Sequence, residues 1–158
     1  MTHIVGISDM KVSNIISDVL VTYSLGSCIG VTLFDPVAQV GGLIHCMLPL
    51  SRIDSVKAET NPVMFTDLGI PLLLKAVFDL GAERKRLVAK VAGAATMLDS
   101  KDLFKIGERN YTVMRKVLWK NNILIASEDI AGTVPRTMFL HMDSGKTIIK
   151  SRGQEVEL

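Results

Sequence analysis

The sequence predicts an α+β fold in which mixed or antiparallel β-sheets form a sandwich flanked by helices. Runs rich in β-branched and aromatic residues, which are typical of strands, outnumber segments with helical spacing by roughly seven or eight to two. These strands and helices do not alternate strictly along the chain, as they would in a doubly wound parallel sheet. The chain has 158 residues, a length that suits one domain spanning residues 1–158.

Strand-like runs dominate the first third of the chain. Four strands are expected, at residues 3–7, 19–23, 28–34 and 42–48. Asp35-Pro36 marks a turn after the third, so the third and fourth strands are expected to pair as a hairpin. Residues 49–62 are mostly polar and bounded by prolines, and they form the longest expected loop, a kind of segment that is often functional or mobile.

Two helices and further strands make up the rest of the chain. Apolar residues with helical spacing predict helices at residues 64–80 and 106–120. Pro71 is expected either to kink the first helix or to lie in its first turn. Strands are expected at residues 87–92, 123–126, 137–142 and 147–150, with the last two joined by the turn Asp143-Ser144-Gly145-Lys146.

Charge and motif content argue against several classes of function. Lys plus Arg number 18 and Asp plus Glu 16, a balance too even to indicate a nucleic-acid or anionic-membrane partner. No signal peptide and no apolar stretch of membrane-spanning length is visible, so a cytoplasmic location with Cys28 and Cys46 as free thiols is expected. Neither Cys-x-x-Cys, His-x-x-x-His nor a glycine-rich phosphate loop occurs, so we expect no metal and no cofactor.

Cys28 is the candidate nucleophile. It follows Gly26-Ser27 between two strand-like runs, and a glycine permits a tight turn that aims a thiol and nearby N–H groups at one point. Acyl transfer needs a nucleophile beside donors that hold an oxyanion, so Gly26 and Ser27 are candidates for substrate or oxyanion contact. A thiol reacts as thiolate, and His45 is the candidate base that lowers its pKa. The pattern predicts a cysteine hydrolase that acts on an amide.

The group that orients His45 stays open on these grounds. The preceding strand-like run holds no Asp or Glu, so Thr22, Ser24 or a backbone carbonyl group would fix the imidazole. Thr22 is expected on the same sheet face as the cysteine. A structural role is the alternative, because free cysteines usually act as small buried hydrophobes and a lone histidine on an apolar strand is usually a core residue. Cys46 is expected to have that structural role, because it alternates to the opposite face of its strand from His45.

These residues resemble the CheD family, the chemoreceptor glutamine deamidases of bacterial and archaeal chemotaxis. The likeness begins with Thr-Tyr-Ser-Leu-Gly-Ser-Cys at residues 22–28, Asp35-Pro36, and Gly-Leu-Ile-His-Cys-Met-Leu-Pro at residues 42–49. It continues through residues 90–95, 106–110 and 128–132 and ends with Arg136 and the turn at residues 144–146. It therefore covers nearly the whole chain in the family's order and spacing.

The resemblance implies a Cys-His-Thr site. Cys28 would be the nucleophile, His45 the general base and acid, and Thr22 the group that orients His45. The implied fold is a sandwich related to the cysteine deamidase domain of bacterial cytotoxic necrotizing toxins. Ala94 and Ala131 stand where the family has glycines, and each adds only a methyl group, which affects loop detail and partner contacts rather than the chemistry.

The implied substrate is a glutamine side chain on the cytoplasmic helices of chemoreceptors, the methyl-accepting chemotaxis proteins. Residues 49–62 are the candidate for substrate contact, and hydrolysis of receptor glutamate methyl esters is an implied side activity. The CheC phosphatase is an implied partner, which would link the protein to CheY. Two alternatives stay open: a non-catalytic or weakly catalytic regulator that binds receptors and CheC, and a redox-sensing thiol.

Overall fold

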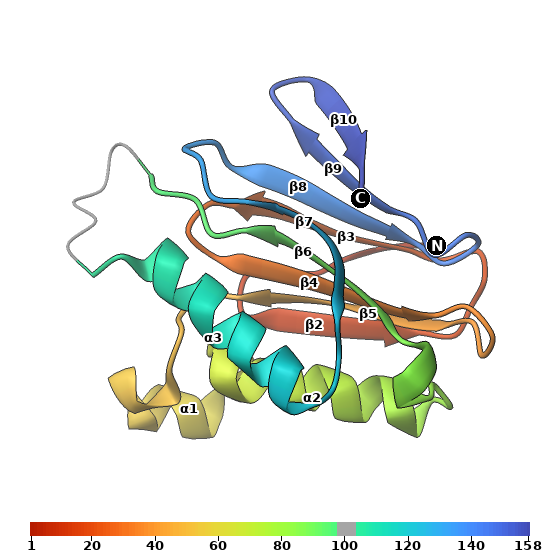
Figure 1. Ribbon diagram of the computed structural model, residues 1–158, viewed down its shortest axis with the longest axis horizontal. Helices are drawn as coiled ribbons and strands as arrows, with labels where there is room; N and C mark the ends of the chain where they lie inside the picture. The colour runs from red at the N-terminus through yellow and green to blue at the C-terminus, as the bar shows by residue number, and fades with distance from the viewer. Residues whose placement is uncertain (98–103) are drawn as a thin grey trace.

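The computed structural model describes residues 1–97 and 104–158. These residues form two five-stranded sheets that lie face to face, with the long helices against the outer face of one sheet (Figure 1). In spatial order, the first sheet contains β1 (Thr2–Ile4), β3 (Val19–Leu25), β8 (Arg136–His141), β9 (Thr147–Ser151) and β10 (Gln154–Glu157). The second contains β2 (Asp9–Ser13), β5 (Val40–Cys46), β4 (Ile29–Asp35), β6 (Val88–Gly93) and β7 (Ile125–Ile130).

Both sheets are mixed, as the sequence predicts. The pairs β1–β3 and β6–β7 are parallel, and the remaining neighbours are antiparallel. The hairpins β4–β5 and β8–β9 confirm the turns predicted after residue 34 and at residues 143–146. The α+β class is therefore confirmed, although the long helices cover the outer face of the second sheet and not that of the first (Figure 1).

β4 and β5 lie in the middle of the molecule, because every residue of both strands is buried. Val31 and Ile44 pack on the helix side of the second sheet. Phe34 and Leu43 pack on its other side, against residues of the first sheet. Burial on both faces explains why these strands appear in the sequence as continuous apolar runs rather than as alternating patterns.

The helices α2 (Thr66–Asp79) and α3 (Ile106–Lys120) confirm the two predicted helices. Each buries one face against the second sheet, through Ile70 and Leu73 of α2 and through Met114 and Leu118 of α3. Burial of each such side chain contributes about 1.5–3 kcal/mol to stability. Pro71 lies in the second turn of α2 with its side chain exposed, so of the two predicted alternatives the first-turn position is excluded.

Residues 49–62 are not a long loop. They contain the 3₁₀ turn η1 (Ser51–Ile53) and the short helix α1 (Ser55–Thr60), and the 3₁₀ turn η2 (Pro62–Met64) follows. The side chain of Asp54 accepts a hydrogen bond from the N–H of Lys57 at 3.1 Å and caps α1. The loop prediction was therefore wrong. Within the described part of the chain, no helix is long and apolar enough to cross a membrane.

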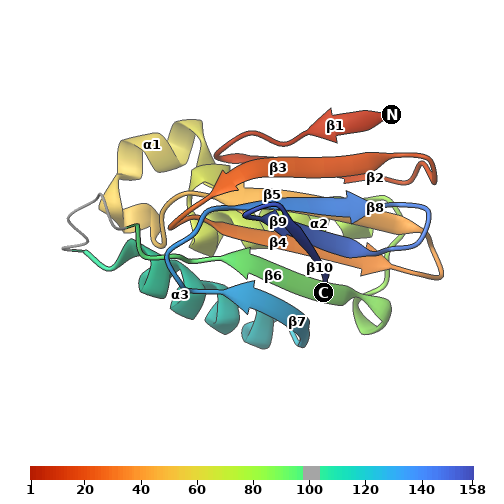
Figure 2. The same ribbon diagram turned by 90° about the horizontal axis from the view of Figure 1, so that it is seen from above.

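One end of the sandwich gathers the ends of several strands, and we call it the turn end. β3, β5 and β6 finish there and β4 begins there, because the β4 register pairs Ile29 with both Cys46 and Gly93. Figure 2 shows α1 and the start of α3 at the same end. The short segment from Gly26 to Cys28 connects the first sheet to the second at this end.

Candidate active site

The turn that carries Cys28 lies where the chain crosses between the sheets. The register of β3 against β8 shifts between Thr22 and Leu25, and such a β-bulge bends the strand just before the turn. Ser24 in this bulge has a φ of +61°, a left-handed conformation that costs a non-glycine residue about 1–2 kcal/mol. The turn is where the sequence predicts it, but its left-handed residue is Ser24 and not Gly26.

Gly26 supplies clearance rather than a donor. Its N–H donates to the carbonyl oxygen of Ser24 at 3.0 Å, so this group is already engaged. A Cβ atom at Gly26 would lie 3.0 Å from the sulfur of Met97, which packs over the turn. Among residues 1–97 and 104–158, the N–H of Ser27 has no hydrogen-bond partner, and the N–H of Cys28 has only its own thiol.

His45 lies between the sheets, hydrogen-bonded to Thr22 of the facing sheet. Its Nδ1 is 2.7 Å from Oγ1 of Thr22, and both side chains are fully buried. The hydroxyl of Thr22 also donates to the carbonyl oxygen of Val5 at 2.7 Å. Because a hydroxyl has one proton, Thr22 must accept a hydrogen bond from Nδ1–H of His45. This arrangement fixes the neutral tautomer that has its lone pair on Nε2.

Nε2 of His45 is the atom that can act as a base. It is buried and has no hydrogen-bond partner among the residues that the structure describes. Burial lowers the pKa of His45 to about 4, so the imidazole is neutral at pH 7 and can accept a proton. A buried polar atom without a partner costs about 1–3 kcal/mol.

Cys28 faces the same layer as His45. The β4–β5 register sets Gly30 opposite His45, so Cys28, two residues before Gly30, lies diagonally from His45 on the same face. Cys28 is partly exposed and packs against the apolar cluster between the sheets. Burial raises the pKa of its thiol to about 11. At neutral pH this burial favours a thiol beside a neutral imidazole, and the activation of Cys28 by His45 stays a prediction.

Each carbonyl group of the turn accepts a hydrogen bond. The bonds run from Ala95 N–H to Gly26 at 2.9 Å, from Ala94 N–H to Cys28 at 2.8 Å, and from Asn110 Nδ2 to Ser27 at 2.9 Å. Sequence reasoning missed Asn110. It is fully buried on α3, and the available signal was a polar residue one helical turn before the apolar Met114.

The loop after β6 supports the turn by close packing. A Cβ atom at Gly93, whose φ is +110°, would collide with the carbonyl oxygen of Cys28. Ala94 and Ala131 have φ values of +56° and +66°, so both alanines adopt a conformation that favours glycine. Arg136 holds this loop by donating to the carbonyl groups of Gly93 at 3.2 Å and Ala131 at 2.8 Å.

Cys46 lies on the other face of β5. It is fully buried in the apolar cluster on the helix side of the second sheet. Burial raises the pKa of its thiol, which makes it unreactive as a nucleophile. The predicted structural role of Cys46 is therefore confirmed.

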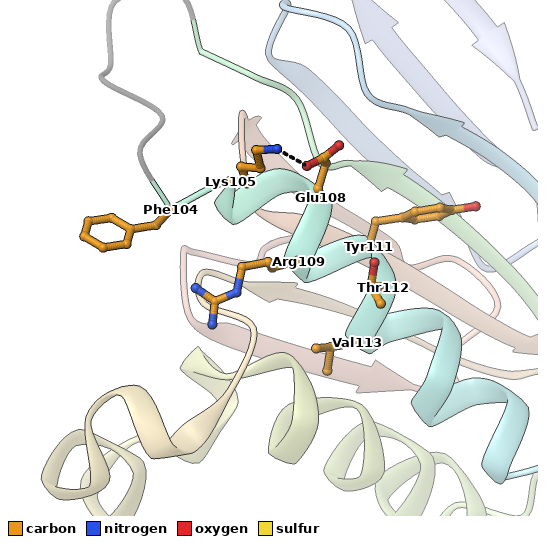
Figure 3. A pocket seen from close by; sticks show the side chains of 7 residues that line it. All are labelled: Phe104, Lys105, Glu108, Arg109, Tyr111, Thr112 and Val113. Atoms are coloured by element: carbon orange, nitrogen blue, oxygen red, sulfur yellow. Dashed lines mark ion pairs between the residues drawn. The ribbon is translucent and has the colours of Figure 1, made fainter.

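Two open grooves of about 700 and 780 Å³ lie along α3. Figure 3 shows the first of them, with Phe104 and Arg109 extending outward and Lys105 paired with Glu108 at 4.0 Å. Neither groove is lined by a residue of the Thr22, Cys28 and His45 set. These grooves are therefore separate from the three predicted site residues.

Comparisons with known proteins point to one family. The family profile described as "CheD chemotactic sensory transduction" matches residues 47–151. A protein of Syntrophus aciditrophicus named "Probable chemoreceptor glutamine deamidase CheD 1" is 52% identical over 150 residues, which cover 95% of this chain and 94% of that protein. A "Probable chemoreceptor glutamine deamidase CheD" of Solibacter usitatus is 47% identical over 155 residues, covering 98% and 92%. One from Caldanaerobacter subterraneus is 40% identical over 156 residues, covering 97% and 94%.

Proposed function

The chain belongs to the CheD family, and we propose that it is a protein-glutamine deamidase that converts glutamine side chains of chemoreceptors to glutamate. The observation that carries this proposal is Nε2 of His45, which has no hydrogen-bond partner among residues 1–97 and 104–158 and belongs to a ring that Thr22 holds on the face that Cys28 shares. A base, a nucleophile and a group that fixes the tautomer of the base are the parts that thiol catalysis on an amide requires.

The proposed reaction has two halves. Nε2 of His45 takes the thiol proton as the sulfur of Cys28 attacks the carboxamide carbon of glutamine. The N–H groups of Ser27 and Cys28 then hold the oxyanion, and one such donor is typically worth about 3 kcal/mol of barrier stabilisation. The imidazolium of His45 gives its proton to the amide nitrogen, the C–N bond breaks, ammonia leaves and a thioester remains. Water, deprotonated by His45, hydrolyses the thioester to glutamate and restores the thiol.

The resting protonation states constrain the order of these events. Proton transfer from a thiol with a pKa of about 11 to an imidazole with a pKa of about 4 is uphill, by on the order of 10 kcal/mol. A preformed thiolate–imidazolium pair is therefore a minor species. Proton transfer accompanies attack, when charge moves from sulfur to an oxyanion that the backbone N–H groups stabilise. Thr22 lowers the barrier by accepting from Nδ1–H as His45 gains charge.

The proposed setting follows from membership of the CheD family. The substrate glutamines lie on the cytoplasmic helices of chemoreceptors, so we place the reaction in the cytoplasm, with CheC as a further partner. We also propose that residues 1–158 act as one domain and that the two-sheet sandwich is related to the deamidase domain of cytotoxic necrotizing toxins. Superposing the two backbones around the cysteine and histidine would test that relationship.

A deamidation assay tests the function. Receptor fragments from the same organism are incubated with the native protein, with Cys28→Ala and with Cys46→Ala, and glutamine-to-glutamate changes are mapped by mass spectrometry. We expect turnover by the native protein and by Cys46→Ala, and a loss of about 10⁵-fold or more in Cys28→Ala. Cys46→Ala is the matched control, because it removes the other thiol, which is buried on the opposite face of β5.

Each contrary outcome has a distinct meaning. If the native protein binds the fragments without changing them, the deamidase proposal falls and the binding-regulator alternative replaces it. If Cys28→Ala retains turnover, the role of Cys28 falls. Fragments that carry glutamate methyl esters, tested in parallel, report the methylesterase side activity.

A further inference from the structure

We propose that Asn110 is a positioning residue for this reaction, which orients the Ser27–Cys28 peptide so that its N–H faces the oxyanion. The inference rests on the deamidase function proposed above. Asn110 lies on α3, outside the Cys-His-Thr set, and its side chain is fully buried. A buried amide is stable only if its donors and acceptor are satisfied. The two donor hydrogens of Asn110 bond the segments that carry Cys28 and His45, and its acceptor faces Thr66 of α2.

The contacts of Asn110 fix which way its amide points. Nδ2 donates to the carbonyl oxygens of Ser27 at 2.9 Å and Met47 at 3.1 Å. Oδ1 lies 3.0 Å from the hydroxyl of Thr66, whose single proton is shared with the carbonyl oxygen of Leu48 at 3.1 Å. Because a carbonyl oxygen can only accept, the NH₂ group must face Ser27 and Met47. One side chain therefore ties the residue before Cys28 to a residue just beyond His45.

Peptide geometry carries this constraint to the reacting atoms. The C=O of Ser27 and the N–H of Cys28 belong to one planar trans peptide, in which they point in opposite directions. With the carbonyl held toward α3 by Asn110, the N–H of Cys28 points away from α3. Burial raises the pKa of the Cys28 thiol and this neighbouring N–H partly offsets that rise, so the N–H is close to the sulfur and is placed to meet an oxyanion formed when that sulfur attacks.

The flanking peptides are held in a different way. The carbonyl groups of Gly26 and Cys28 accept from backbone N–H groups of the loop after β6, which most substitutions would leave in place. Within residues 1–97 and 104–158, the carbonyl of Ser27 is held by the side chain of Asn110. Replacement of one side chain therefore releases the peptide that supplies the proposed oxyanion donor.

Two rates measured on the same variants separate positioning from general damage. The first is kcat for deamidation of a receptor fragment, which needs the oxyanion donor. The second is the rate of alkylation of Cys28 by iodoacetamide in a Cys46→Ala background, a displacement reaction that forms no oxyanion. For Asn110→Ala we expect kcat to fall about 100-fold with little change in KM, as for loss of one oxyanion donor. Alkylation should change by less than about 5-fold, since the thiol and His45 remain.

Thr66→Val is the matched control. It damages the same buried network but leaves the bond from Asn110 to Ser27 intact. We expect it to lower stability and to keep kcat within about 3-fold, because a buried hydrogen bond to Oδ1 contributes to folding and not to the oxyanion donor.

Asn110→Asp provides a second route if the alanine variant does not fold. A carboxylate in this place faces two carbonyl oxygens, and burial raises its pKa. When the carboxyl group is protonated it can donate again to one of them, so we expect the kcat of this variant to recover, relative to native protein, as the pH falls.

The outcomes are distinguishable from those for the deamidase itself. If the native protein shows no turnover, the proposed function falls, and this inference with it. If the native protein is active and Asn110→Ala keeps kcat within about 3-fold, the positioning role alone is overturned. The same holds if alkylation falls in parallel with kcat, or if the aspartate variant shows no recovery at low pH, because either result indicates a structural role.

Discussion

Two buried polar pairs bridge the two sheets, and they differ in whether one of their polar atoms lacks a hydrogen-bond partner. Thr22 of β3 meets His45 of β5 at 2.7 Å, and Thr147 of β9 meets Thr32 of β4 at 2.7 Å. All four side chains are buried. In the threonine pair one hydroxyl donates to the other and neither group titrates near neutral pH. In the threonine–histidine pair, Nε2 of the imidazole is left without a partner in the described residues.

The difference shows how a hydrogen bond in the core can leave a basic atom available for chemistry. Each pair satisfies polar groups in a dry layer, which is a structural role. Thr22 already donates its proton to Val5, so it can only accept from His45, and the basic atom of the ring is directed elsewhere. The two contacts have similar geometry. They differ chemically because the one proton of the Thr22 hydroxyl is used by Val5, so His45 must donate through Nδ1 and keep its lone pair on Nε2.

The pH dependence of stability is the largest expected difference between the pairs. Burial lowers the pKa of His45 from 6.5 in the unfolded chain to about 4, so the unfolded chain binds the proton first. Stability should therefore fall as the pH falls from about 6.5 to about 4, by about 3 kcal/mol in total. Urea unfolding at several pH values in this window measures the slope, which His45→Gln should remove.

Thr32→Val is the control for this slope. It disrupts the threonine pair, which carries no titrating group, so its stability should be lower by a constant amount across the same window. Asp18 and Asp35 also have lowered pKa values, but their stabilisation is lost as the pH falls below about 4. Equal slopes in native protein and His45→Gln would mean that the imidazole is not held neutral.

Catalysis should distinguish the two threonines next. Thr22→Val removes the acceptor that fixes the tautomer of His45, and we expect kcat to fall about 10- to 100-fold, equivalent to about 1.4–2.7 kcal/mol of barrier. Thr32→Val should leave kcat within about 2-fold. Both substitutions remove one buried hydroxyl, so both should lower the free energy of unfolding by about 1–2 kcal/mol. Steady-state deamidation kinetics and urea titrations of the two variants test this pair of expectations, and equal kcat losses would contradict the role of Thr22.

The parts of the fold that periodicity describes were predictable, and the rest was not. The apolar spacing of α3 gives its bounds, and the β4–β5 hairpin follows from its turn residues. β10 was missed because every residue in it is exposed, and β2 because it mixes polar and partly buried residues at a sheet edge. No apolar pattern marks such strands, and they form because a neighbouring strand offers backbone partners.

Some residues of the candidate site were likewise predictable from the sequence and others were not. Cys28 and His45 are candidates from their local sequence, whereas Thr22 is singled out only by the resemblance to the CheD family. The sequence places Thr22 on the same sheet as the cysteine, yet it lies on the facing sheet, because β3 pairs with β8 from the far end of the chain. Asn110 was missed for the same physical reason: its partners lie on two segments far away in the sequence, and spacing along a helix does not reveal them.

The smallest expected effects concern the backbone beside the reactive pair. Ala94 and Ala131 are left-handed alanines at the turn end, and each conformation costs about 1–2 kcal/mol relative to a right-handed one. Glycine removes that cost but loses about 0.5–1 kcal/mol in chain entropy. Ala131 is exposed, so Ala131→Gly should raise the free energy of unfolding by about 0.5–1 kcal/mol. Ala94 is buried, and loss of its methyl group, worth about 0.8 kcal/mol, should leave Ala94→Gly close to neutral.

Deamidation kinetics of these variants show whether the left-handed backbone at residues 94 and 131 affects catalysis by Cys28 and His45. We expect kcat to stay within about 2-fold in both, because the N–H of residue 94 still donates to the carbonyl of Cys28. Gly93→Ala is the opposing control, since its added methyl group would collide with that same carbonyl and displace the turn. A drop of about 10-fold in kcat for Ala94→Gly at unchanged stability would mean that the left-handed alanine restrains Cys28. Catalysis would then depend on the backbone of the loop after β6 as well as on the side chains of Thr22 and His45.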